Sequence, residues 1–136
     1  MEDTEKRTEI NGVLLDIENN EAKVVTFVPN LQNYYRMLHC CTIDIVERKI
    51  GVRKGKRFDI VCDDEGLLKN EPKISAINDM GAPMLVGSLL VVGLAKEGLE
   101  QTLSDEDAEF VMEKIKKMRT RLHPEGYLML TQCEDC

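Results

Sequence analysis

The longest uncharged stretch of the chain contains residues 84–93, in which Ser88 is the only polar side chain. An amphipathic helix would gather polar residues on one side, and this run has no polar side. Its valines suit a pleated strand, and Pro83 and Gly93 bound it. The pattern predicts one strand, buried on both faces at the centre of an antiparallel sheet, with a bulge at Gly87.

Four more strands are predicted upstream, arranged in two hairpins. Residues 12–17 and 22–28 are apolar runs joined by a turn that contains Asn, which tolerates the left-handed backbone of a tight reversal. Residues 42–47 and 58–62 alternate apolar and polar positions, which is typical of strands with one face in water. The segment 48–57 joins them, and we predict that it forms an extended hairpin tip.

Two helices are predicted to cover the sheet. Residues 30–39 present an apolar face at helical spacing, with Asn30 as the N-cap. Ser104 is the expected N-cap of a second helix, with Asp107 in the capping-box position. The apolar stripe of this second helix continues to Leu122, so we expect the helix to end there.

The remaining segments complete the predicted architecture. A single helical turn is expected at residues 73–77 and a final strand at 127–131. The fold class is α+β: one domain over residues 1–136, with a mostly antiparallel sheet of about six strands covered by two helices. Residues 1–10 and 132–136 are expected to be flexible ends.

Composition predicts a soluble protein of the cytoplasm. Hydrophobic residues make up 43% of the chain, an ordinary share for a globular protein, and no apolar run approaches the ~20 residues of a membrane helix. The polar, acidic start of the chain differs from a signal peptide. Five cysteines are an odd number, so reduced thiols are expected rather than a disulfide framework.

Charge distinguishes residues 48–57 from the rest of the chain. The net charge of −7 argues against a general affinity for nucleic acid or anionic membranes, but this segment contains only basic charges. Its six basic residues are Arg48, Lys49, Arg53, Lys54, Lys56 and Arg57. Such side chains neutralise phosphates, and Gly51 and Gly55 would let backbone amides approach an anion. The alternative is a solvated edge loop that prevents aggregation.

Several motifs resemble those of one family of small proteins. They are the acidic turn at 63–66 ending in Glu-Gly, the Val86-Gly87 pair in the apolar run, and the helix start at 103–106. The similarity covers about residues 12–122, and the family, of unknown function, is frequent in phages, prophages and plasmids. The resemblance implies an origin in a mobile element and brings no activity, cofactor or catalytic residue.

Two features depart from this family. Its members usually have a short connection in place of residues 48–57, and often a small residue, typically Gly, where Cys40 and Cys41 stand. The role of the basic segment is therefore expected to be peculiar to this branch of the family.

Other candidate sites have plainer structural explanations. Tyr35, next to Tyr34, could stack on a base, but its helical spacing favours packing. The carboxylates at 63–65 could bind a metal, but a solvated turn is the favoured interpretation of this segment. The cysteines whose spacing could bind zinc are Cys40, Cys41, Cys133 and Cys136. A zinc site would require two adjacent cysteines and two cysteines from the last four residues of the chain to converge on one ion, so no metal is expected.

These features predict a non-catalytic binding protein. The chain has two histidines and shows no phosphate-binding loop and no nucleophile–base spacing. We expect a cytoplasmic homo-oligomer without a cofactor, holding an anionic phosphate-bearing ligand on the six basic residues with Tyr35. A nucleotide is favoured over a nucleic-acid strand, and a host defence nucleotide that the protein sequesters would suit the implied origin. The alternative is an inhibitor or adaptor that docks on a host protein through an acidic, DNA-mimicking surface.

Overall fold

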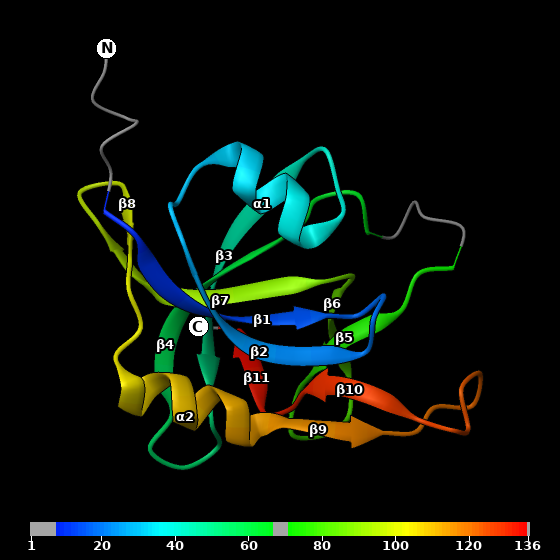
Figure 1. Cartoon of the computed structure of the whole chain (residues 1–136). Coiled ribbons are helices and arrows are strands. Elements are labelled where there is room, and N and C mark those ends of the chain that lie inside the picture. Colours follow the sequence, from blue (N-terminus) through cyan, green and yellow to red (C-terminus); the bar gives the residue numbers. More distant parts are fainter. Residues whose placement is uncertain (1–7, 67–70, 136) are drawn as a thin grey trace.

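Strands dominate the structure, a computed structural model that describes residues 8–66 and 71–135. They form a larger and a smaller sheet, accompanied by two helices (Figure 1). The predicted α+β class with mostly antiparallel strands is therefore confirmed. The pattern predicts one sheet of about six strands, whereas the structure divides a greater number of strands between two sheets.

The larger sheet has the strand order β11-β3-β4-β7-β1-β2, with the short β8 attached to β7. Its strands are β1 (Ile10–Asp16), β2 (Glu21–Phe27), β3 (Ile43–Ile50), β4 (Lys56–Asp63), β7 (Leu89–Lys96), β8 (Leu99–Gln101) and β11 (Cys133–Asp135). The pairings are antiparallel, and both predicted hairpins, β1–β2 and β3–β4, are present. The strand β7 lies between β4 and β1, at the centre of the sheet.

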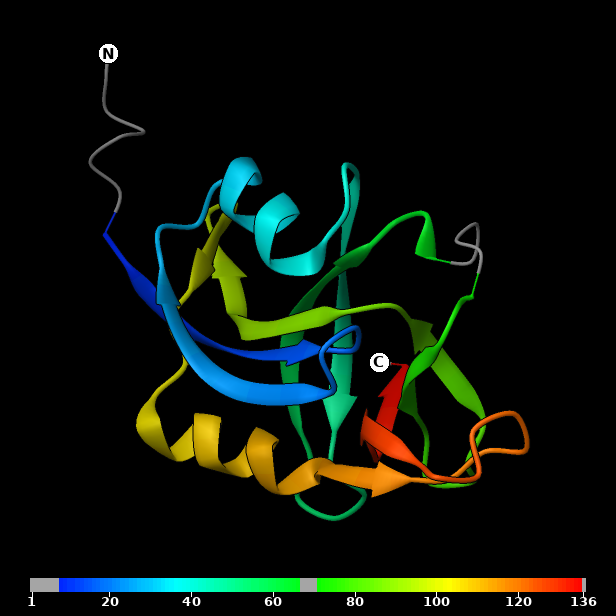
Figure 2. The ribbon, with the colours of Figure 1, turned by 45° about the vertical axis from the view of Figure 1, so that its right-hand side comes forward.

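The smaller sheet has the order β6-β5-β10-β9. Its strands are β5 (Ile74–Ile77), β6 (Pro83–Val86), β9 (Ile115–Met118) and β10 (Tyr127–Leu130). The pair β5–β10 is parallel and the other pairs are antiparallel. The chain leaves β10 and enters β11 after two residues, so the two sheets meet at this link (Figure 2).

The two helices begin at the predicted caps. The helix α1 (Leu31–Leu38) follows Asn30, whose side chain accepts a hydrogen bond from the Asn33 amide (2.8 Å). The helix α2 (Asp105–Lys114) follows Ser104, whose hydroxyl accepts from the Asp107 amide (3.1 Å). Each bond satisfies one amide of a first turn. In the described parts of the chain, no helix is long and apolar enough to cross a membrane.

The first half of β7, residues 89–92, is buried from both sides, as predicted. Leu90 and Val92 belong to a core cluster with residues of α1, whereas Leu89 and Val91 belong to a second cluster with residues of α2. All four side chains have no exposed surface. Because successive strand residues point to opposite faces, the two helices cover opposite faces of the larger sheet.

The predicted strand over residues 84–93 is divided at Gly87. This residue has φ +87°, and its amide donates to the Lys73 carbonyl (2.9 Å) as the chain passes from β6 into β7. The buried Ser88 hydroxyl accepts from the Ile17 amide (3.0 Å). Glycine adopts this left-handed backbone without a Cβ penalty. The Gly-Ser pair is therefore a break between two sheets rather than a bulge in one strand.

Three further predictions about elements are wrong. The second helix ends at Lys114 rather than near Leu122, because residues 115–118 pair with β10 instead. Residues 74–77 form the strand β5 where a helical turn was expected. The segment 132–136, expected to be a tail, contains β11, in which Cys133 is fully buried.

Candidate functional site

The basic segment 48–57 is mostly part of two paired strands. The strand β3 ends with Arg48, Lys49 and Ile50, and β4 begins with Lys56 and Arg57. Both strands extend further than predicted, so only the short segment between them forms the tip.

Strand pairing divides the cations between two faces of the hairpin. Lys49 lies opposite Arg57 on one face. Arg48 lies opposite Phe58 on the other face, and Phe58 belongs to the core cluster beneath α2. Since successive side chains of a strand point to opposite faces, these cations do not converge on one point.

Three of the six cations already have acidic partners. The pairs, with N–O distances of 3.3, 2.7 and 3.5 Å, are Arg48–Asp135, Lys56–Asp107 and Arg57–Glu47. The hydrogen bond to Asp107 is the main cause that raises the pKa of Lys56 above its ordinary value. These acids compete with any anionic ligand for the same side chains.

Arg53 and Lys54 occupy the exposed tip, and the side chain of Lys49 extends toward it. A Cβ added to Gly55 would lie 2.7 Å from Lys49 Cε, so this side chain crosses the glycine. None of the three cations forms an ion pair within residues 8–66 and 71–135. They are the members of the basic segment that remain available to a ligand.

Gln132, in the link between β10 and β11, holds the backbone of the tip. The Gly51 amide donates to the Gln132 carbonyl (2.9 Å), and the Val52 amide donates to Gln132 Oε1 (3.1 Å). The amides of Gly51 and Val52 therefore already have partners within the protein.

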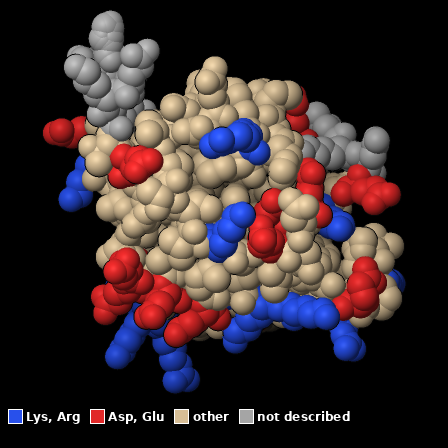
Figure 3. Space-filling view, viewed as in Figure 1, with Lys and Arg blue, Asp and Glu red and all other residues tan. Residues whose placement is uncertain are grey.

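An open hollow of about 350 Å³ adjoins the tip. It is lined by Val52, Arg53, Asp79, Lys114 and Gln132. Lys114 Nζ also lies 5.2 Å from the centre of the Phe110 ring. Figure 3 shows blue side chains along the lower edge of the molecule, over the hairpin tip and β9. Lys114 was not among the predicted site residues, because its basic run was interpreted as the end of a helix.

Tyr35 does not join the basic tip. It is half-buried on α1, which packs against the Ile43 and Val61 end of the hairpin. The strand β3 covers roughly 23 Å between that end and the tip, at about 3.3 Å per residue. Figures 1 and 2 place α1 and the tip at opposite ends of the molecule. The neighbouring Tyr34 is buried, and its hydroxyl donates to Glu100 Oε1 (2.6 Å).

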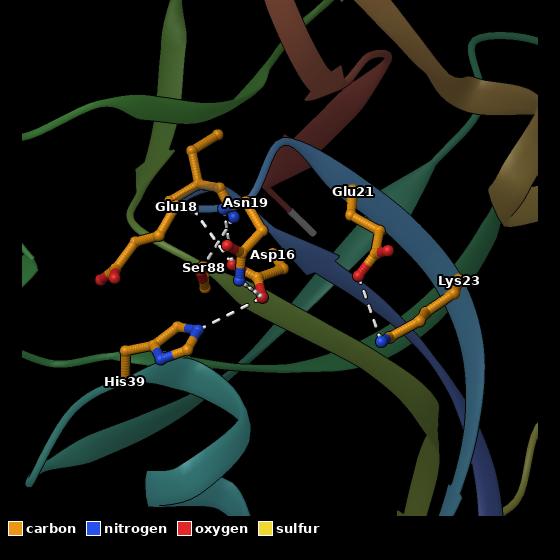
Figure 4. A network of polar contacts seen from close by, with 8 residues as sticks. Asp16, Glu18, Asn19, Glu21, Lys23, His39 and Ser88 are labelled. Carbon is orange, nitrogen blue, oxygen red and sulfur yellow. Dashed lines mark hydrogen bonds and ion pairs between the residues drawn. The ribbon is translucent and has the colours of Figure 1, made fainter.

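A second polar cluster surrounds the buried carboxylate of Asp16 at the end of β1 (Figure 4). The Asp16 carboxylate accepts hydrogen bonds from Asn19 Nδ2 (2.8 Å) and from the backbone amides of Glu18 and Asn19 (both 3.1 Å). One of its oxygens also lies 3.2 Å from His39 Nε2. Burial raises the pKa of Asp16, but the hydrogen bonds from Asn19 and His39 together lower it below its ordinary value. The cluster closes the β1–β2 turn and attaches the end of α1 to it.

A pocket of about 310 Å³ lies beside this cluster. Its lining includes Ile17 and Ser88 together with the charged residues Glu18, Glu71 and Lys73. Two acids against one base do not suit a phosphate. The described residues contain no group of three or more His, Cys, Asp or Glu side chains that could hold a metal ion. Cys136 lies outside the described residues.

Most of the fold matches a known family. A family model described as a domain of unknown function, DUF3846, matches residues 10–118, from the first residue of β1 to the last residue of β9. The chain belongs to the DUF3846 family. The DUF3846 match contains the basic hairpin and excludes β10 and β11. No curated protein and no solved structure matches the chain.

Proposed function

We propose that this DUF3846 protein is a non-catalytic binding protein that holds a phosphate-bearing ligand, a nucleotide, at the tip of its basic hairpin. One observation carries the proposal: the Lys49 side chain crosses Gly55 next to the exposed tip residues Arg53 and Lys54, and no acid pairs with these three cations among the described residues. Cations without partners lose no existing ion pair when they bind a phosphate. The net charge of the whole chain is −7, which makes such a concentration of bases informative.

Each cation has a distinct role in this proposal. Arg53 offers a planar fork that binds two phosphate oxygens at once, and the ammonium groups of Lys49 and Lys54 act as point charges beside it. Arg48, Lys56 and Arg57 contribute mainly to the local field, because each is paired with an acid. Tyr35 is not part of the proposed site.

The proposal also concerns the setting of the protein. We place it in the host cytoplasm, as a homo-oligomer encoded by a phage or a related mobile element. Holding a nucleotide without converting it would withdraw a host defence signal. Several hairpin tips brought together by oligomerisation would strengthen such binding.

Calorimetric titration with inorganic tripolyphosphate tests the site without assuming a base. Changing Arg53 and Lys54 together to Ala should weaken binding at least about tenfold, a loss of about 1.4 kcal/mol. The matched control is Arg36→Ala with Lys96→Ala, which removes the same charge from residues remote from the tip. Equal binding by the tip variant and the control would overturn the proposal.

Native mass spectrometry of the purified protein complements this titration. We expect an assembly larger than a monomer that retains a nucleotide. A stoichiometric protein partner without any small molecule would instead favour the acidic-surface inhibitor.

A further inference from the structure

Residues 114–121 form a second basic segment that the proposed function does not yet use. Like residues 48–57, this segment contains no acid, and the two segments hold five and six of the 18 Lys and Arg residues of the chain. Its bases are Lys114, Lys116, Lys117, Arg119 and Arg121. They run from the last residue of α2 through the edge strand β9, and Arg119 and Arg121 lie just beyond it.

The fold places the two basic segments side by side. Arg53 from the hairpin and Lys114 line the same hollow of about 350 Å³. A second hollow of about 250 Å³, which includes Lys116, shares Asp79 and Gln132 with the first. The two hollows therefore adjoin, and together they make a shallow groove from the hairpin tip toward β9. Its lining contains three cations and the carboxylate of Asp79, whose amide donates to Glu134 Oε2 (3.3 Å).

The cations of this second segment are available to a ligand. Lys116, Lys117, Arg119 and Arg121 are exposed, and in the described part of the chain none of them forms an ion pair. Lys114 contacts the Phe110 ring rather than an acid. An edge strand with lysines also resists pairing with other strands, but that purpose does not require a groove continuous with a second basic segment.

We infer that this groove binds the phosphate backbone of a single-stranded nucleic acid, with the hairpin tip holding one part of the strand and β9 the next. The inference rests on the proposed function, because it assumes that the tip holds phosphate. The tip cations bind one phosphate-bearing group, and the cations of the second segment are spread further along the surface, which suits a ligand with additional phosphates at intervals.

The neighbouring acids favour one strand over a duplex. Exposed carboxylates of α2 flank the basic strip, including Asp105, Glu106, Glu109 and Glu113. Figure 3 shows this red group over α2 beside the blue edge. A duplex would bring its second, equally charged backbone closer to these acids.

The lining of the groove indicates binding without a sequence preference. Neither hollow is lined by an aromatic ring on which a base could stack. Contacts to phosphate fix position and carry no sequence information. The affinity should therefore fall steeply as the salt concentration rises. On a single strand, the logarithm of the binding constant should fall by about 0.7 per tenfold increase in salt for each phosphate that the protein neutralises.

Fluorescence anisotropy with labelled oligothymidylates of 4, 8 and 16 nucleotides tests the inference. We expect affinity to rise with length, and the charge-reversal variant Lys116→Glu, at the lysine of β9 that lines the groove, to bind the 16-mer at least about tenfold more weakly. The control Lys96→Glu, remote from the groove, should bind like the wild type. Circular dichroism checks that both variants are folded.

Tripolyphosphate separates this inference from the proposed function. The β9 variant Lys116→Glu should bind tripolyphosphate as the wild type does, because the tip is intact. Two outcomes would refute the strand groove and leave the tip site standing, provided that tripolyphosphate binds. In one, the affinity does not rise with oligonucleotide length. In the other, the β9 variant and its control bind the 16-mer equally well. Absence of binding to both ligands would refute both proposals, and tighter binding of a duplex would refute the single-strand assignment.

Discussion

At the residue scale, Asp16 links the β1–β2 turn to α1 through its buried carboxylate. Its pKa is lowered in the folded state, so its contribution to stability is present above the ordinary value of about 4 and is lost as the pH falls through the folded pKa. Asp16→Asn should therefore cost about 1–3 kcal/mol at pH 7, and the difference should shrink below about pH 4.

Denaturant unfolding at pH 7 and pH 3 measures this effect. Asp64→Asn, an exposed acid, is the control and should change stability little. A destabilisation by Asp16→Asn that stays constant with pH would contradict the role of the carboxylate charge.

The cysteines should differ sharply in reactivity. Burial, followed by the charge of Asp44, raises the pKa of the Cys62 thiol to about 11, so only about one in a thousand of these thiols is ionised at pH 8. Cys133 is fully buried, whereas Cys41 is exposed. Peptide mass spectrometry after brief alkylation should find Cys41 labelled before Cys62 and Cys133, which should react only after unfolding. Early labelling of Cys62 would show that β4 is not packed as described.

The ion pair between Lys56 and Asp107 offers a gain-of-function test. Asp107→Asn should free the Lys56 ammonium, whose hydrogen bond to Asp107 is 2.7 Å long, and strengthen tripolyphosphate binding by a few fold. Asp105→Asn removes the same charge from the same helix turn without breaking an ion pair. Calorimetry should find tighter tripolyphosphate binding by Asp107→Asn than by Asp105→Asn. Equal affinities of the two variants would show that Lys56 plays no part in binding the ligand.

At the element scale, the sequence predicts what depends on local pattern and misses what depends on distant partners. The hairpins, both N-caps and the buried β7 follow from alternation, capping chemistry and apolar runs. Ile115 and Met118 also fit the stripe of a helix, but pairing with β10 takes them into a strand. The strand β11 has only three residues and depends on its neighbour β3, so no local pattern predicts it.

Gly87 decides where the apolar run divides between the two sheets. Its φ of +87° penalises a side chain, although a Cβ there would have space, with the nearest atom at 3.6 Å. Gly87→Ala should destabilise the protein by about 1–2 kcal/mol through backbone strain alone. Gly87→Asn should cost less, because Asn tolerates this backbone better. Thermal unfolding compares the two, and equal losses would point to packing instead.

At the scale of the whole molecule, the chain is acidic overall and concentrates its bases in two segments that the fold brings together at one groove. The hairpin half of this surface could be predicted, because six bases without an acid stand out in the sequence. The β9 half could not, because cations at the end of a predicted helix already have an explanation in the helix dipole. Only the folded chain places Lys114 beside Arg53.

The most direct test of the central claim is an NMR titration of the isotope-labelled protein with tripolyphosphate, which maps the bound phosphate onto the backbone. We predict that the largest amide shifts occur at residues 49–55, with smaller ones near Lys114 and none in α1. Shifts concentrated around Asp16 and Ser88, or spread over the molecule without a maximum at the hairpin tip, would contradict the account.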